Sequence, residues 1–107
     1  MTIYKKLVRD HIPNIIAGNG KSCEFNILEQ DLFIVELKKK LKEEVAEYLA
    51  AMNDNDAVEE LADILEVIHA LAETHHKSYN EIEFVRQKKF DERGGFKNKY
   101  FLIKSSG

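Results

Sequence analysis

The sequence predicts a mainly all-α fold, a small antiparallel helical bundle in a single domain that spans residues 1–107. Two long segments, 32–52 and 56–75, carry apolar residues at helical spacing. Only the short polar turn 53–55 separates them, and the one proline of the chain, Pro13, precedes both. Because short connections make successive helices antiparallel neighbours, these observations favour a bundle.

The N-terminal third contains one short expected helix and one extended segment. Residues 9–17 are typical of a helix with Asp10 as its N-cap and Pro13 in its first turn. The glycines at 18 and 20 are expected to end it. Residues 23–28 alternate weakly between apolar and polar, which indicates a short strand or an extended arm.

Start signals mark the two long helices. The segment 32–52 follows Asp31, and Asp56 with Glu59 forms a capping pair that opens the helix 56–75. We therefore expect the first long helix to start after Asp31 and the second to open at Asp56.

A third long helix is expected over 78–92. Ser78 and Glu81 form a stronger capping box at its start, and the glycines at 94 and 95 are expected to stop it. The following apolar stretch, 99–104, is interpreted as a second short strand or arm that pairs with the first one.

Composition excludes several classes of protein. The net charge is −3, no apolar run approaches the ~20 residues that cross a membrane, and no signal peptide is expected. The single cysteine, Cys23, excludes a disulfide scaffold and a cysteine zinc site. These observations predict a cytoplasmic protein without a membrane partner. The net charge and the lack of a basic helix with aromatic residues disfavour nucleic-acid binding.

Charge is distributed unevenly along the chain. Residues 36–73 carry a net charge of −7, whereas residues 1–21 carry +3 and residues 86–107 carry +5. Solvated helix faces explain such a distribution. A cation site in the middle of the chain explains it too, with basic groups from both ends holding an anion that shares the cation.

Carboxylates lie where apolar residues are expected. Glu44 lies at the edge of the apolar face of its helix with Glu47 on the same flank, and Glu60 and Asp63 repeat the i, i+3 spacing on the next helix. A carboxylate in an apolar stripe is costly unless its charge is compensated. An oxygen-rich site suits Mg²⁺ or Mn²⁺. The alternative is that these glutamates form salt bridges with neighbouring lysines, which are Lys38, Lys39, Lys40 and Lys42.

Three motifs together carry a resemblance to a known family. Glu43-Glu44-Val45-Ala46-Glu47 and, after twelve intervening residues, Glu60-Leu61-Ala62-Asp63 resemble the acidic signature of the all-α NTP pyrophosphatase superfamily, which includes MazG. The opening Tyr4–Asp10 with Ile12-Pro13, and Glu92-Arg93-Gly94-Gly95-Phe96, resemble a small MazG-like branch of house-cleaning pyrophosphatases. The resemblance covers about residues 3–102.

The resemblance implies hydrolysis of a nucleoside triphosphate, in this branch a noncanonical one, to a monophosphate and pyrophosphate with Mg²⁺. It implies that Glu44, Glu47, Glu60 and Asp63 are metal ligands, and that Glu43 is a further catalytic residue. No Walker loop is present in the sequence. Phosphoanhydride hydrolysis depends mainly on charge neutralisation and an aligned water, which suits a set of carboxylates.

Basic residues near both ends are candidates for binding the phosphates. They are Lys6, Arg9, Lys89, Arg93 and Lys97. Arg93 is the strongest, because an arginine can grip phosphate with two donors and the two glycines after it let the backbone approach a ligand. A plain helix end explains one of those glycines, solvation explains Lys97, and an ion pair with Asp10 explains Arg9.

Self-association is expected, as a homodimer or homotetramer. The helix 56–75 is apolar over too wide an arc to be covered by one neighbour. Two rival functions stay open, phosphoribosyl-ATP pyrophosphohydrolase and a non-catalytic helical oligomeric interaction module.

Overall fold

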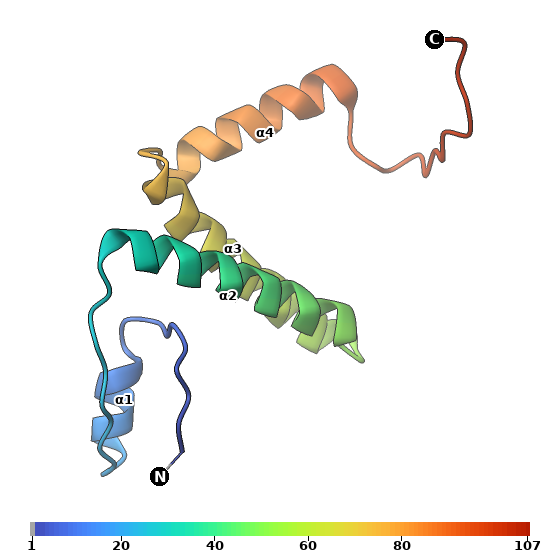
Figure 1. Cartoon of the computed structure of the whole chain (residues 1–107). Coiled ribbons are helices and arrows are strands. Elements are labelled where there is room, and N and C mark those ends of the chain that lie inside the picture. Colours follow the sequence, from blue (N-terminus) through green and yellow to red (C-terminus); the bar gives the residue numbers. More distant parts are fainter. Residues whose placement is uncertain (1) are drawn as a thin grey trace.

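The structure is a computed structural model that describes residues 2–107, and within them it contains four helices and no strand. The helices are α1 (Ile12–Gly18), α2 (Gln30–Ala50), α3 (Asp54–Thr74) and α4 (Tyr79–Arg93). Figure 1 shows their arrangement. The predicted all-α fold is confirmed. Among the described residues, no helix has the length and apolar composition needed to cross a membrane.

The helices α2 and α3 form the centre of the molecule. They run antiparallel over 21 residues each, joined by residues 51–53, and lie side by side (Figure 1). Their contact contains the buried apolar side chains of the described chain, Leu37 on α2 with Val67 and Ala72 on α3. This core is small, and most side chains of the hairpin therefore lie on its surface.

Three helix starts differ from the expected ones. The helix α2 begins at Gln30 with Glu29 as its N-cap, two residues before the start expected after Asp31. Asn53, rather than Asp56, caps α3, because its side-chain oxygen accepts a hydrogen bond from the backbone N–H of Asp56 at 2.9 Å. The helix therefore begins two residues earlier than the capping pair predicts. At α1 the N-cap is His11 without a side-chain hydrogen bond, so the N-cap role expected for Asp10 is wrong.

The corner between α3 and α4 is fixed by hydrogen bonds. His76 adopts a left-handed conformation with φ +60°, and the backbone N–H of Lys77 donates to the carbonyl of Ala72 at 3.1 Å. The predicted capping box is confirmed, because Ser78 accepts from the N–H of Glu81 while the Glu81 carboxylate accepts from the N–H of Ser78. The geometry of the corner sets the direction in which α4 leaves.

The extended segments 23–28 and 99–104 do not pair, so the predicted strands are wrong and the extended-arm alternative holds. They lie on opposite sides of the hairpin, the first beside α1 and the second beyond the end of α4 (Figure 1). A strand without a partner leaves its backbone groups unsatisfied by any ladder, which explains why neither forms.

The chain is open in shape. Its radius of gyration is 18.4 Å and its extents are 62 × 35 × 22 Å. A compact domain of this length has a radius of gyration of about 13 Å. The excess comes from both ends of the chain, because α1 with its flanking segments and α4 with the segment after it extend away from the hairpin (Figure 1).

Candidate metal centre

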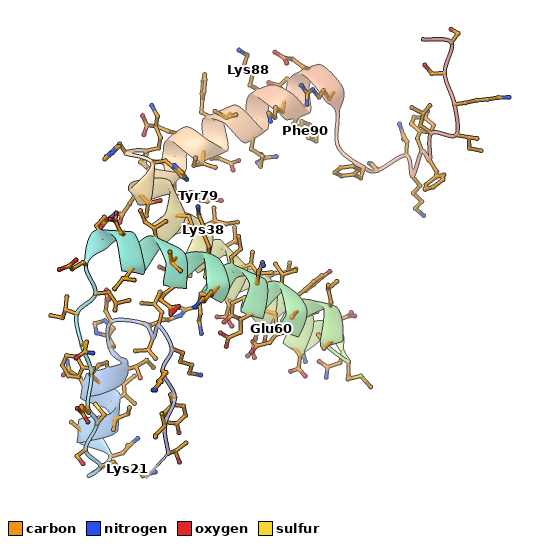
Figure 2. The ribbon with its side chains drawn as sticks, viewed as in Figure 1. Lys21, Lys38, Glu60, Tyr79, Lys88 and Phe90 are labelled. Carbon is orange, nitrogen blue, oxygen red and sulfur yellow. The ribbon has the colours of Figure 1, made fainter. Side chains whose placement is uncertain are left out.

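Three carboxylates meet where α2 and α3 lie against each other. Glu44 and Glu47 stand one turn apart on α2, and Glu60 faces them from α3. One oxygen from each residue lies within 4.8 Å of the others. We call Glu44, Glu47 and Glu60 the carboxylate cluster; Figure 2 labels Glu60 on the hairpin.

Glu44 is the most deeply placed member of the carboxylate cluster. Only 6% of its surface is exposed, and its Oε2 atom is buried without a hydrogen-bond partner. The Oε2 atom of Glu60 is in the same situation. A buried carboxylate oxygen without a partner is destabilising. Two of them on facing helices leave a place where a cation or a shared proton could supply the missing partner.

Lys40 supplies part of the compensating charge. Its Nζ lies 3.5 Å from Oε1 of Glu44 and 3.6 Å from Oε1 of Glu43. The salt-bridge alternative is therefore realised at one lysine, one turn before the carboxylate cluster. It does not reach the buried Oε2 atoms of Glu44 and Glu60, so the unmet need for positive charge lies on the inner side.

The proton affinities of the carboxylate cluster reflect its crowding. Burial, with the close carboxylates and negative charges of Glu47 and Glu44, raises the pKa of Glu60 from 4.5 to about 7. Burial also raises the pKa of Glu44, against the lowering effects of the adjoining Glu60 side chain and of the charge of Lys40. The raised pKa values of Glu44 and Glu60 show that the crowded carboxylates favour a proton, which supplies the kind of charge that a metal ion would bring.

Asp63, the fourth predicted ligand, is engaged elsewhere. It lies one turn after Glu60, but its Oδ1 accepts a hydrogen bond of 2.6 Å from Nη2 of Arg9. The structure therefore brings together three of the four predicted ligands and pairs the fourth with one of the predicted phosphate-binding residues. The expected pairing of Arg9 with Asp10 is not the one observed.

Glu43 lies at the edge of the site. Its carboxylate contacts Lys40 and is not among the three that converge. Its place is that of a side chain supporting the lysine beside Glu44.

The other basic candidates lie apart from the carboxylate cluster within one chain. Lys6 is exposed, with its Nζ 5.6 Å from the ring centre of Tyr4. Lys89 and Arg93 lie on the part of α4 that projects away, where Figure 2 labels Lys88 and Phe90, and the exposed Lys97 follows α4. The helix α4 contacts α3 and not α2.

Local structure accounts for both glycines after Arg93. Gly94 has φ +79° and ψ 179°, a conformation that only glycine adopts readily. A Cβ on Gly95 would lie 3.1 Å from the ring of Phe90. The two glycines therefore serve the end of α4, and they do not by themselves indicate a ligand.

A hollow of about 310 Å³ lies at the α2–α3 connection, with Tyr48, Met52 and Asp54 among its lining residues. No member of the carboxylate cluster lines it. The carboxylate cluster itself lies along the hairpin, where Glu47 is exposed and Glu60 half-buried.

Comparison of the chain with protein-family models, curated proteins and solved structures finds no match in any of the three. The support for the candidate site therefore comes from the geometry of this chain.

Proposed function

We propose that the chain is a Mg²⁺-dependent nucleotide pyrophosphohydrolase that cleaves noncanonical nucleoside triphosphates to a monophosphate and pyrophosphate, with Mn²⁺ as an alternative ion. The single observation that carries the proposal is the inner side of the carboxylate cluster, where Glu44 and Glu60 each bury an unpartnered oxygen. The MazG-like spacing of the acidic motifs supports the same activity.

The carboxylate cluster has the donor chemistry of a hard cation. Carboxylate oxygens suit Mg²⁺ and Mn²⁺, and Mg²⁺ usually shares its shell with water and substrate phosphates. Glu44, Glu47 and Glu60 would hold the ion, with Asp63 joining them when it leaves Arg9. The bound ion would supply charge neutralisation for the phosphates and an activated water.

Residues of the chain would accept the proton of the attacking water and bind the phosphate oxygens. Hydrolysis adds water across the bond between the α and β phosphates, so the anhydride bond breaks and pyrophosphate leaves. A carboxylate of the cluster, with Glu43 nearby, accepts the proton that the water loses. Arg9 stands beside the site and provides a donor for phosphate oxygens.

The exposed cysteine and the exposed apolar side chains bear on the compartment and the oligomeric state of the chain. We propose a cytoplasmic homodimer or homotetramer, since Cys23 is an exposed free thiol and many large apolar side chains are exposed. Those exposed side chains also favour the rival function, a non-catalytic helical interaction module. Phosphoribosyl-ATP hydrolysis would use the same chemistry on a different substrate.

A nucleotide panel tests these functions. Canonical, damaged and phosphoribosylated nucleoside triphosphates are incubated with the protein and Mg²⁺, and pyrophosphate and orthophosphate are measured separately. We expect pyrophosphate from a noncanonical triphosphate, loss of turnover in Glu44→Gln, and no loss in the control Glu66→Gln. Glu66 is an exposed glutamate on α3 outside the carboxylate cluster. Orthophosphate as the direct product contradicts the proposal, and no turnover of any nucleotide favours the module.

A further inference from the structure

The last third of the chain exposes an unusual amount of apolar surface. We call residues 79–107, which are α4 and the segment after it, the C-terminal arm. Three of its large apolar residues are Phe90, Phe96 and Phe101, which are exposed by 49%, 97% and 89%. Contiguous apolar surface of this kind marks a site of interaction.

The C-terminal arm is held to the hairpin only at its beginning. The ring of Tyr79 stacks on that of His69, with centres 3.9 Å apart, and Ile82 closes an apolar notch beside Ile68 and Leu71 of α3. Beyond this point α4 leads away from α2 and α3 (Figure 2). Within the described residues 2–107, α4 contacts no helix other than α3.

The direction of α4 is fixed. The left-handed residue His76, the capping box of Ser78 and Glu81 and the stacked rings all lie at the corner. Laying α4 back along its own α3 would require another backbone conformation at His76 and would separate the ring of Tyr79 from that of His69. The projecting half of α4 is therefore better placed to pack on a surface outside its own hairpin.

The outer face of α3 offers a complementary surface. Val58, Leu61 and Leu65 lie on one side of the helix and are exposed by 64%, 44% and 46%. We call them the α3 stripe; α2 leaves it uncovered. The helix α3 carries seven acidic residues and no lysine or arginine, whereas the C-terminal arm carries seven basic residues against four acidic ones, a net charge of +3. Each copy of the chain therefore presents a basic apolar arm and an acidic apolar stripe.

We propose that the C-terminal arm is exchanged between two copies of this chain, each packing its arm on the α3 stripe of the other. The partner is a second copy because both complementary surfaces are present on every chain, so one reciprocal contact covers both. The exchange would also account for the part of the open shape that comes from the C-terminal arm, since α4 and the segment after it project from the hairpin of their own chain. This inference gives a structural basis for the proposed homo-oligomer, and its test measures mass and proximity rather than turnover, so each can fail alone.

Mass measurement with paired variants tests the exchange. Light scattering on the eluting full chain should give a multiple of 12.4 kDa. Phe101→Asp on the arm and Leu65→Asp on the α3 stripe should each shift the mass to that of one chain, with helicity by circular dichroism unchanged. Ile27→Asp is the matched control, because Ile27 is 91% exposed but lies on neither surface. A single-chain mass for the unaltered protein, or a mass that both variants leave unchanged, overturns the proposal.

Cross-linking separates exchange from folding back. In a Cys23→Ser background, isotopically labelled Leu65→Cys protein is mixed with unlabelled Phe101→Cys protein and treated with a short bismaleimide. A labelled–unlabelled product is expected. The double variant with both new cysteines then serves as the second arm of the test. If it forms the link only within one chain while the mixture forms none, the C-terminal arm folds onto its own hairpin and the proposal is wrong.

Discussion

Arg9 and Asp63, 54 positions apart in the sequence, are joined by a hydrogen bond of 2.6 Å between Nη2 and Oδ1. The bond ties the N-terminal segment to α3 one turn away from Glu60. It also gives a cation to the one predicted ligand that stays outside the carboxylate cluster. Arg9 therefore neutralises Asp63 in the arrangement without metal.

This relationship predicts how Arg9→Ala changes metal binding. If Asp63 joins the bound ion, losing its competitor should strengthen binding of Mg²⁺ without nucleotide. The pair is exposed by 58% and 39%, and such pairs contribute about 0.2–1 kcal/mol, so the gain should be at most about fivefold. Calorimetric titration measures it. Arg86→Ala is the control, because Arg86 makes an equally short pair with Glu83 away from the site. Weaker Mg²⁺ binding in Arg9→Ala would mean that Arg9 organises the site rather than competing for it.

Glu44→Gln distinguishes a metal ligand from a structural glutamate. The substitution keeps the side-chain volume and removes a charge whose burial is only partly compensated by Lys40. We expect the rate of hydrolysis to fall on the order of a hundredfold or more. The melting temperature of the metal-free protein should stay equal or rise, because repulsion within the carboxylate cluster is relieved. A lower melting temperature with full activity would assign Glu44 to the salt bridge alone.

Asp63→Asn should behave differently from Glu44→Gln in the metal-free protein. The substitution removes the partner of Arg9, so the free energy of unfolding should fall slightly, by no more than about 1 kcal/mol. Turnover with Mg²⁺ should still fall strongly if Asp63 becomes a ligand. Denaturant unfolding with and without Mg²⁺ measures both effects, and normal turnover would restrict the ligands to the carboxylate cluster.

The stability of the metal-free protein should depend on pH through Glu60. Its pKa is raised from 4.5 to about 7 on folding, so the folded state binds more protons than the unfolded state between these values. Stability should therefore decrease as the pH rises from about 4.5 to 7 and then level off. Burial raises the pKa of Glu44 too, which adds an effect of the same sign.

Thermal unfolding across this pH range checks the dependence. Glu60→Gln should flatten it, and saturating Mg²⁺ should reduce or reverse it because metal binding requires the deprotonated ligands. Glu83→Gln is the control, since Arg86 lowers the pKa of Glu83 and its contribution is lost only as the pH falls below about 4.5. A metal-free protein that gains stability between pH 5 and 7 would contradict the raised pKa of Glu60.

The sequence predicts the helices well because their signals are local. Apolar spacing places α2 and α3 within two residues of their observed bounds, and the Ser78–Glu81 capping box is read directly from the residue types. The start of α3 is missed because Asn53 and Asp56 are both good caps, and only the backbone shows that Asn53 accepts the hydrogen bond. Choosing between neighbouring caps needs the backbone conformation.

The site is predicted only in part, because helical spacing is a local signal and contacts between distant residues are not. Helical spacing brings Glu44 and Glu47 to one flank, and the hairpin brings Glu60 opposite them. The pairing of Asp63 with Arg9 joins residues 54 positions apart and leaves no local signal. The two glycines after Arg93 also mislead, since the φ of Gly94 and the ring beside Gly95 are properties of the folded helix end.

Arg93→Ala tests whether the basic end of α4 reaches the phosphates. Arg93 is exposed, and in one chain it lies at the end of the helix that leads away from the carboxylate cluster. Any contact with substrate must therefore come from a second copy. We expect Arg93→Ala to raise KM for a triphosphate more than for a diphosphate, because fewer phosphate oxygens remain for it to bind. Arg93→Lys should rescue KM only in part, since lysine lacks the paired donors of the guanidinium. Mg²⁺ binding without nucleotide should not change.

The competing account is a favourable interaction of Arg93 with the C-terminal end of α4, worth about 0.3–1 kcal/mol. Equal KM effects on both substrates together with a lower melting temperature would assign Arg93 to the helix end, and the phosphate-binding role would then fall to Arg9.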